Sequence, residues 1–256
     1  MTFKILYLYP DLLDLYGDSG NIEVLKYRMK KRGIKCIVDT YSILEEKPNF
    51  EDYNLIFMGG GADREQTILS KDLIKYKEDI EKAIKKGVFV LLICGGFQLF
   101  GKYYKDGTGN IIDGLGIFDY YTVGTSRKKR NVGNIIINSK INNTYTKVIG
   151  FENHGGVTYN IETPFGKILH KNKNNHSRYE GFMTDNVIGT YLHGPLLSKN
   201  PILADYIIKT GLQNKLKKEI ELKALNDDLE NQCREVLITQ FLKKWSFTNL
   251  IIITLK

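Results

Sequence analysis

The sequence has 256 residues, 42% of them hydrophobic, and its 37 basic and 29 acidic residues give a net charge of +8. This length can bury a self-sufficient core, and the ordinary composition excludes a disordered chain. The basic residues are spread thinly, which favours solvated helix faces or loops; they would also suit an anionic substrate or a membrane surface, and no nucleic-acid motif accompanies them. We find no signal peptide, no transmembrane segment and no CxxC pair among the three cysteines. We therefore expect a cytoplasmic protein that could act at the inner membrane face.

Strands and helices alternate over the first hundred residues. Strands are predicted at residues 4–9, 35–39, 54–58 and 87–93, and helices at 21–32 and 73–86. This alternation is typical of a parallel, doubly wound sheet with right-handed crossovers.

The pattern changes after residue 107. Antiparallel or mixed strands that flank the parallel core are predicted at 120–122, 132–138, 147–151, 167–170 and 187–192, and amphipathic helices at 201–209 and 227–244. The fold class is therefore α/β, with a mostly parallel doubly wound sheet, flanking helices and additional antiparallel strands. We predict one domain over residues 1–210 and a C-terminal helical extension over 211–256 that could dock a partner.

The most informative stretch is the apolar run at 87–93, which ends in Cys94-Gly95-Gly96. A reactive residue at the turn from a buried strand into a helix sits on a tight elbow at the carboxyl edge of the sheet. The helix N-terminus that follows favours a thiolate and a developing oxyanion, and glycines permit the turn. Cys94 is thus a candidate nucleophile; the alternative is a buried cysteine packed as a small apolar residue.

A cysteine nucleophile needs a base, and histidine is the usual one. His193 ends the apolar strand at 187–192, where the carboxyl ends of parallel strands would form a crevice. His154 follows another strand and could line a cleft, whereas His170 and His176 stand among lysines and asparagines in a predicted solvated loop. His193 is the leading candidate, and a hydrogen-bonded core histidine is the alternative.

A glycine run, Gly59-Gly60-Gly61, follows the strand at 54–58. Its backbone N–H groups could share an oxyanion with the N–H of Gly95, because a tetrahedral intermediate needs two donors. The run alone is a weak signal, since tight turns use the same residues. No Gly-Lys-Ser/Thr follows it, so it does not predict ATP binding.

Five motifs in this order resemble class I glutamine amidotransferases, most closely their cobyric-acid-synthase-like (CobB/CobQ-like) branch. They are Tyr16-Gly17-Asp18-Ser19-Gly20-Asn21, the glycine turn with Asp63-Arg64-Glu65-Gln66, Ile93-Cys94-Gly95-Gly96-Phe97-Gln98, Gly150-Phe151-Glu152-Asn153-His154-Gly155-Gly156, and Gly189-Thr190-Tyr191-Leu192-His193-Gly194-Pro195. Within that branch, residues 3–210 are most similar to glutaminase subunits of lipid II isoglutaminyl synthases. The resemblance implies a flavodoxin-like core, attack of Cys94 on the side-chain amide of L-glutamine, a thioester intermediate, and His193 as general base and acid.

The resemblance also implies a substrate site. Arg130 matches an arginine that binds glutamine, and a guanidinium fork suits the α-carboxylate of that substrate. A solvated basic loop is the alternative for Arg130, because residues 127–129 are also basic. The remaining substrate-binding residues implied are Gly60, Gly61, Gly95 and Gln98.

The same resemblance implies a heterodimer with an ATP-using, Mur-ligase-like subunit of the MurT type. The partner would use the ammonia to amidate the D-glutamate α-carboxylate of lipid II or a related wall precursor, and ATP and Mg²⁺ are expected on the partner, with no cofactor or metal on this chain. Pro195 stands where many amidotransferases have a third catalytic residue, Glu, so we hypothesise that the partner supplies the acid. Two alternatives stay open: another acceptor, such as a cobyrinate-like corrinoid precursor, and a catalytically silent partner-binding subunit.

Overall fold

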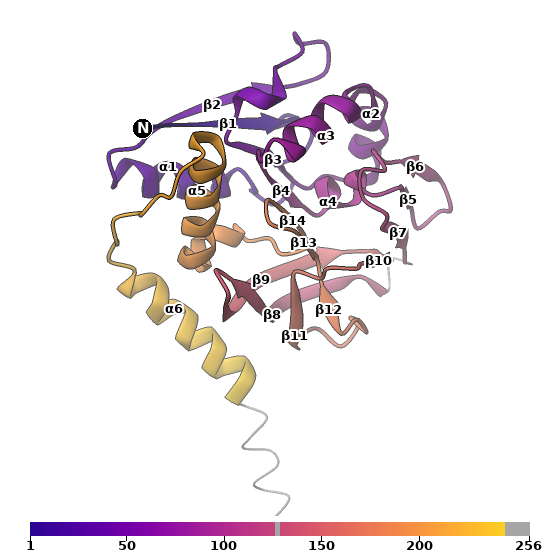
Figure 1. The fold of residues 1–256 in the computed structure, drawn as a ribbon. Helices are drawn as coiled ribbons and strands as arrows, with labels where there is room; N and C mark the ends of the chain where they lie inside the picture. The colour runs from indigo at the N-terminus through magenta and orange to yellow at the C-terminus, as the bar shows by residue number, and fades with distance from the viewer. Residues whose placement is uncertain (126–128, 244–256) are drawn as a thin grey trace, which may run out of the picture.

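The computed structural model describes residues 1–125 and 129–243, and a six-stranded sheet forms the centre of one half of the molecule (Figure 1). In spatial order its strands are β13 (Phe182–Met183), β14 (Val187–Thr190), β4 (Phe89–Ile93), β3 (Leu55–Met58), β1 (Thr2–Leu8) and β2 (Lys35–Tyr41). The strands pair in parallel except for β13 and β14, which are antiparallel. β3, β4 and β14 are buried along their whole length, which explains their continuous apolar sequences. The parallel sheet predicted from the sequence is confirmed.

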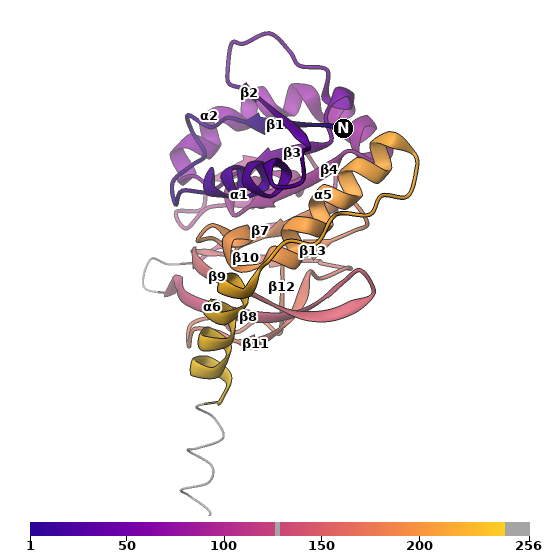
Figure 2. The same ribbon diagram turned by 90° about the vertical axis from the view of Figure 1, so that its left-hand side faces the viewer.

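Helices cover both faces of this sheet (Figures 1 and 2). On one face α1 (Gly20–Lys30) contacts α5 (Pro201–Leu216), and on the other lie α2 (Asp63–Leu73) and α3 (Lys77–Lys85). From β1 to β2 the chain crosses the sheet in one direction, and from β3 to β4 it crosses in the opposite direction. Because such crossovers are right-handed, the helices that form them lie on opposite faces of the sheet. Shorter segments are α4 (Gly95–Phe100) and the 3-10 turns η1 (Phe50–Asp52), η2 (Ile74–Tyr76) and η4 (Leu196–Lys199).

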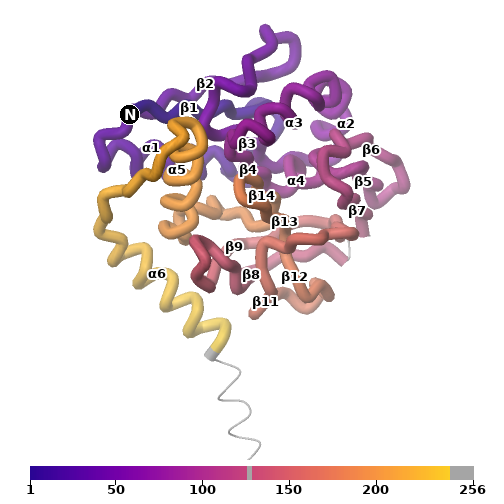
Figure 3. Tube along the Cα trace, viewed as in Figure 1, coloured from indigo at the N-terminus to yellow at the C-terminus, as the bar shows by residue number. Residues whose placement is uncertain are grey.

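Between β4 and β14 the chain builds two four-stranded sheets, and Figure 3 traces this excursion. One has the order β10 (Gly156–Tyr159), β7 (Tyr121–Gly124), β5 (Tyr103–Lys105) and β6 (Ile111–Asp113). The other has the order β12 (Tyr179–Glu180), β11 (Gly166–His170), β8 (Asn131–Ile141) and β9 (Thr144–His154). Asn142 and Asn143 both have positive φ between β8 and β9, the conformation that a two-residue hairpin turn requires.

Two features of the fold differ from the expectations. The sequence predicts that the strand at 187–192 flanks the parallel core, but β14 lies within the parallel sheet beside β4. Helix α2 is not predicted, because its polar first turn continues the glycine turn without an apolar signal. Residue 210, where we predict that the domain ends, lies inside α5, which runs to Leu216, and the division into a domain and an extension stays a prediction.

The C-terminal segment contains α6 (Asp228–Ile238) and one π-helical turn, η5 (Thr239–Lys243), which confirms the predicted amphipathic helix. The apolar stretch at 249–256 lies outside the described residues. None of the helices within residues 1–125 and 129–243 is long and apolar enough to cross a membrane.

One buried guanidinium joins α1, α5 and the start of α6. Arg28, only 3% exposed, donates to both carboxylate oxygens of Asp205 at 2.7 and 2.8 Å and to both of Asp227 at 2.6 and 3.0 Å. Because Asp205 also accepts from Arg32, the charges in this cluster are shared among several hydrogen bonds.

We predict that Arg28→Met lowers the free energy of unfolding by about 3 kcal/mol, because it leaves Asp227 without its guanidinium partner and weakens the pairing of Asp205. Urea unfolding followed by circular dichroism measures this change. Lys26→Met, which removes an exposed i,i+3 ion pair on the same helix, is the control. Equal unfolding free energies for the two variants would contradict the prediction.

Candidate active site

Cys94 occupies the turn between β4 and α4. Its φ of +51° and ψ of −101° form a strained elbow for a residue with a side chain, and only 7% of the residue is exposed. Its backbone N–H donates to the carbonyl of Thr190 at 2.8 Å. A Cβ at Gly96 would lie 2.8 Å from the carbonyl oxygen of Met58, so only glycine fits at that position. The sheet therefore fixes the backbone that presents the thiol.

His193 reaches the same place from the neighbouring strand. β14 lies parallel to β4, with Thr190 opposite Ile93, and His193 follows three residues later. Its backbone N–H and C=O pair with those of Phe151 at 2.9 and 3.2 Å, and the residue is 1% exposed. A Cβ at Gly60 would lie 3.0 Å from Cys94 Cβ and 3.0 Å from His193 Cε1, so the two side chains face each other across that glycine.

A third residue, Asp18, orients the histidine. Its Oδ1 lies 2.9 Å from His193 Nδ1, and its carboxylate is fully buried. Asp18 belongs to the loop after β1, where a Cβ at Gly20 would lie 2.2 Å from Pro195 Cγ, so the loop packs directly against the segment after the histidine. This chain therefore places a carboxylate of its own beside Nδ1, and the hypothesis that the partner supplies an acid stays a prediction. Sequence reasoning does not pair Asp18 with His193, because the two residues are 175 positions apart.

The electrostatics of His193 follow from these neighbours. Burial lowers its pKa, but hydrogen bonding and charge from Asp18 and the adjacent Cys94 outweigh burial and raise the pKa to about 10. Its Nε2 is buried and accepts or donates no hydrogen bond within the described part of the chain. The ring of Tyr16 packs edge-on against the imidazole, with centroids 4.8 Å apart. The raised pKa favours the imidazolium, in which Asp18 holds Nδ1 and Nε2 carries the proton taken from the thiol.

The glycine turn contributes differently from the expectation. The N–H of Gly60 donates to Asp18 Oδ2 at 2.8 Å, so this donor is already used. The N–H groups of Gly61 and Gly95 have no acceptor within residues 1–125 and 129–243. A Cβ at Gly95 would lie 3.2 Å from Gly61 N, which places these two backbones side by side. They form a geometrically suitable donor pair for a developing oxyanion.

A cavity of about 350 Å³ opens over the thiol. Arg130 lines it and is half-buried, with Nη2 donating to the backbone and side-chain oxygens of Asn153, both at 3.0 Å. Gln98 also lines it, and its Nε2 donates to the hydroxyl of Tyr191 at 3.4 Å. The structure thus places Arg130, Gly61 and Gln98 around Cys94, and their substrate-binding roles stay predictions. Residues 127 and 128 of the basic loop lie outside the described residues.

The other histidines have different surroundings. His154 lines the same cavity, but its Nδ1 is 2.8 Å from the carbonyl of Gly156 and its ring stacks on Tyr191 at 3.8 Å. His170 is half-buried beside Phe241, and burial lowers its pKa. His176 is exposed. None of the three replaces His193 beside the thiol.

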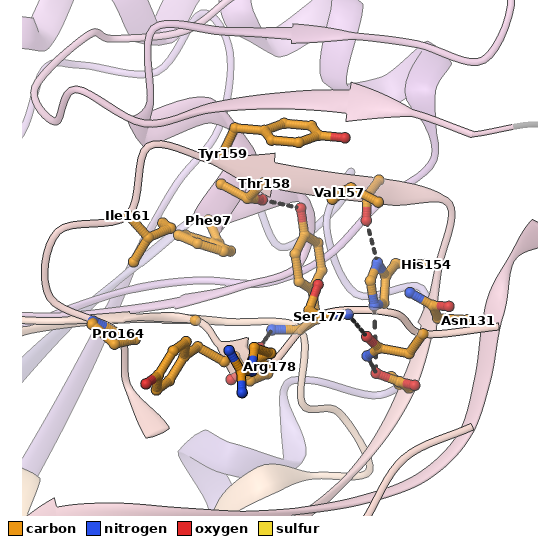
Figure 4. Close-up of a pocket in the computed structure, with 17 residues that line it drawn as sticks. Phe97, Asn131, His154, Val157, Thr158, Tyr159, Ile161, Pro164, Ser177 and Arg178 are labelled. Atoms are coloured by element: carbon orange, nitrogen blue, oxygen red, sulfur yellow. Dashed lines mark hydrogen bonds and ion pairs between the residues drawn. The ribbon is translucent and has the colours of Figure 1, made fainter. Parts of the chain in front are cut away.

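A second cavity of about 300 Å³ lies beyond His154 (Figure 4). Thr158 and Tyr159 lie on one side of it and Arg178 on the other. Glu180 also lines this cavity and accepts hydrogen bonds from the N–H of Tyr191 at 2.7 Å and the hydroxyl of Thr190 at 2.9 Å. Burial raises the pKa of Glu180 to about 8, against the lowering effect of these two donors.

A cysteine on a strand-to-helix elbow of a parallel sheet, beside a histidine and its carboxylate, is the arrangement expected of a class I glutamine amidotransferase. Residues 4–201 match the family model described as the CobB/CobQ-like glutamine amidotransferase domain. The chain belongs to this family and is a glutamine amidotransferase.

Curated relatives agree with this assignment. The chain is 40% identical to the lipid II isoglutaminyl synthase (glutamine-hydrolyzing) subunit GatD of Streptococcus pneumoniae, over 91% of this chain and 89% of that protein. It is equally identical to the subunit of that name from Staphylococcus aureus, over 91% of this chain and 94% of the relative. A cobyric acid synthase of Clostridium botulinum is 29% identical, over 67% of this chain but 37% of that longer protein.

Solved structures agree on the fold. PurLQS from Thermotoga maritima superimposes with a TM-score of 0.54 and 16% identity, covering 85% of this chain and 99% of that chain. A crystal structure of a glutamine amidotransferase gives a TM-score of 0.52 and 14% identity, covering 80% and 98%. At these identities the likeness concerns the fold alone.

We predict that Asp18→Asn lowers kcat for glutamine hydrolysis by about 10²–10⁴-fold with little change in KM, because an amide cannot stabilise the imidazolium. Steady-state ammonia release measures both constants. Asp11→Asn, an exposed acid in the same loop, is the matched control. A kcat for Asp18→Asn within twofold of the control would show that this carboxylate does not orient the base.

A second prediction concerns pH and Glu180. The carboxyl group of Glu180 ionises near its ordinary pKa of 4.5 in the unfolded chain, but only near 8 in the folded protein. As the pH rises from 4.5 to 8, this group therefore lowers the free energy of unfolding. Glu180→Gln removes the ionisable group: its Oε1 can still accept from the N–H of Tyr191, and its Nε2 can donate to the hydroxyl of Thr190. We expect it to raise Tm at pH 8 by several degrees more than at pH 5, as measured by thermal melts at both pH values. An equal change at the two pH values would contradict the assigned pKa.

Proposed function

We propose that this chain is the glutaminase subunit of a two-subunit synthase that amidates a cell-wall precursor. The observation that carries the proposal is the 40% identity to two lipid II isoglutaminyl synthase subunits over nine-tenths of this chain and of each relative. The class of reaction, glutamine-dependent amidation, is that of the family.

In the proposed chemistry His193 takes the proton of the Cys94 thiol, and the thiolate attacks the side-chain amide carbon of L-glutamine. The tetrahedral oxyanion is stabilised by the N–H groups of Gly61 and Gly95. The imidazolium returns its proton to the leaving nitrogen, the C–N bond breaks, and ammonia and a glutamyl thioester form. Water, deprotonated by the same histidine, then cleaves the thioester to glutamate and free thiol.

Substrate binding is proposed for the cavity over the thiol. The guanidinium of Arg130 would hold the α-carboxylate of glutamine in a fork, and its hydrogen bonds to Asn153 support that orientation. Gln98 and the glycine turn would line the amide end of the substrate. These contacts fix the distance between the α-carboxylate and the reacting amide, which selects for the length of the glutamine side chain.

The ammonia would pass to a Mur-ligase-like partner of the MurT type. That partner would bind ATP and Mg²⁺, activate the D-glutamate α-carboxylate of lipid II, and convert it to D-isoglutamine. No cofactor or metal is proposed on this chain. The complex would act in the cytoplasm, at the inner membrane face that presents the lipid-linked precursor.

A cobyrinate-like acceptor is the second candidate, because cobyric acid synthases also match the chain. We rank it lower, since those matches have less identity and the chain spans little more than a third of such a protein.

The deciding experiment measures ammonia release from glutamine by the purified chain, alone and with its Mur-ligase-like partner. We predict that Cys94→Ala abolishes release, because the thioester cannot form, and that 6-diazo-5-oxo-norleucine labels Cys94 in the unmodified chain. Cys233→Ala, an exposed cysteine, is the matched control and should keep full activity.

Amidation of lipid II by the complex would support the wall precursor as acceptor. Ammonia release with amidation of a corrinoid instead would overturn the acceptor but keep the glutaminase. Release that persists in Cys94→Ala would overturn the proposed nucleophile.

A further inference from the structure

The outer edge of β9 is occupied by side chains and one backbone segment instead of a strand. Alternate residues of an edge strand direct their backbone N–H and C=O groups away from the sheet. On β9 these include Lys147, Ile149 and Phe151, and at each of the three at least one of the two backbone groups is bound. Arg234 binds the carbonyl of Lys147 at 2.7 Å, Asn200 binds the N–H and C=O of Ile149 at 3.0 and 2.7 Å, and the backbone of His193 binds Phe151.

These three partners are linked to one another. Arg234 Nη1 donates to Asn200 Oδ1 at 2.7 Å and to the carbonyl of Lys199 at 2.9 Å. Asn200 Nδ2 also donates to the carbonyl of Leu196 at 2.7 Å, so it closes the turn that follows the histidine. Lys199 Nζ donates to the carbonyl of Gly194, the residue directly after His193, at 2.7 Å. A continuous set of hydrogen bonds therefore runs from α6 to the base.

Arg234 has an unusual environment for a cation. It is 9% exposed, and its hydrogen bonds within the described part of the chain go to the carbonyl oxygens of Lys199 and Lys147 and the side-chain oxygen of Asn200, none of them a carboxylate. Burial lowers its pKa. A planar guanidinium can satisfy three oxygens in fixed directions, which an ammonium cannot do with the same geometry. Ile238, one turn further along α6, packs on Ile136 and Ile149 and keeps the helix against the sheet.

We propose that Arg234 is a positioning residue for the glutaminase reaction: through Asn200 it holds the segment 193–200 against the edge of β9 and sets the position of His193 relative to Cys94. The C-terminal helix would then support catalysis as well as extend the fold. The proposal rests on His193 acting as base in the proposed function.

The test measures the rate of Cys94 alkylation by iodoacetamide at pH 7, resolved by peptide mass, together with kcat and KM for glutamine. We predict that Arg234→Met lowers both the alkylation rate and kcat about tenfold with KM nearly unchanged, because the base is displaced while the substrate cavity is intact. In Arg234→Ala, which vacates the site, millimolar guanidinium chloride should restore at least a third of the lost rate. For Arg234→Lys we expect a kcat and an alkylation rate between those of Arg234→Met and those of the unmodified chain.

Asp227→Asn is the matched control, since it weakens the attachment of the same C-terminal segment at Arg28 without touching β9. Equal effects of Arg234→Met and Asp227→Asn, or no restoration by guanidinium in a variant that melts normally, would overturn the proposal. If Arg234→Met does not fold, a wild-type rate for Arg234→Lys overturns it. The double variant Arg234→Met with Asn200→Ala should lose less activity than the sum of the two single losses, because both substitutions break the same link.

The alkylation measurement also distinguishes a failure of this proposal from a failure of the proposed glutaminase function. If the unmodified chain and its complex release no ammonia while Cys94 reactivity still depends on Arg234, the positioning role stands and the glutaminase chemistry fails.

Discussion

The carboxylate of Asp18 is the contact on which the candidate site depends. One oxygen binds the imidazole of His193 and the other binds the backbone N–H of Gly60, so a single buried group ties together the loop after β1, the glycine turn after β3 and the end of β14. Each of these segments follows a parallel strand at the same edge of the sheet, and none could be fixed by local sequence. The orientation of the base and the position of the adjacent donor turn are consequently set together. A change that moves one will move the other.

The sequence predicts the nucleophile better than it predicts the triad. The apolar run before Cys94 and the glycines after it define an elbow by local rules, and the elbow is present. The pairing of β4 with β14 follows less directly, because the strands are separated by 93 residues that form two other sheets. Asp18 could not be assigned, since no periodicity marks a loop aspartate as the partner of a histidine far along the chain. Helix α2 was missed for a related reason: its polar first turn gives no hydrophobic pattern, and burial of Gln66 and Leu69 is decided by tertiary contacts.

The edge of β9 shows how this fold handles exposed backbone groups beside a catalytic residue. An unpaired edge strand is a place where another strand can add and extend the sheet. Here its outward positions bind the backbone of His193 and the side chains of Asn200 and Arg234, so protection of the edge and placement of the histidine use the same hydrogen bonds. The guanidinium reaches these positions from a helix that lies beyond the residues of the family model.

The position of the two extra sheets separates the proposed catalytic residues from the proposed substrate-binding residues. Cys94 and His193 end adjacent strands of the parallel core, and Asp18 follows another, whereas Arg130, Asn153 and His154 belong to the excursion between β4 and β14. The reacting groups are thus encoded outside the segment that forms most of the cavity wall. Redesigning the cavity-lining residues of that segment, while keeping the edge of β9 that holds His193, would change which molecule is recognised and leave the nucleophile and its base in place. The residues proposed to recognise the substrate can therefore vary without a change in the residues proposed to react.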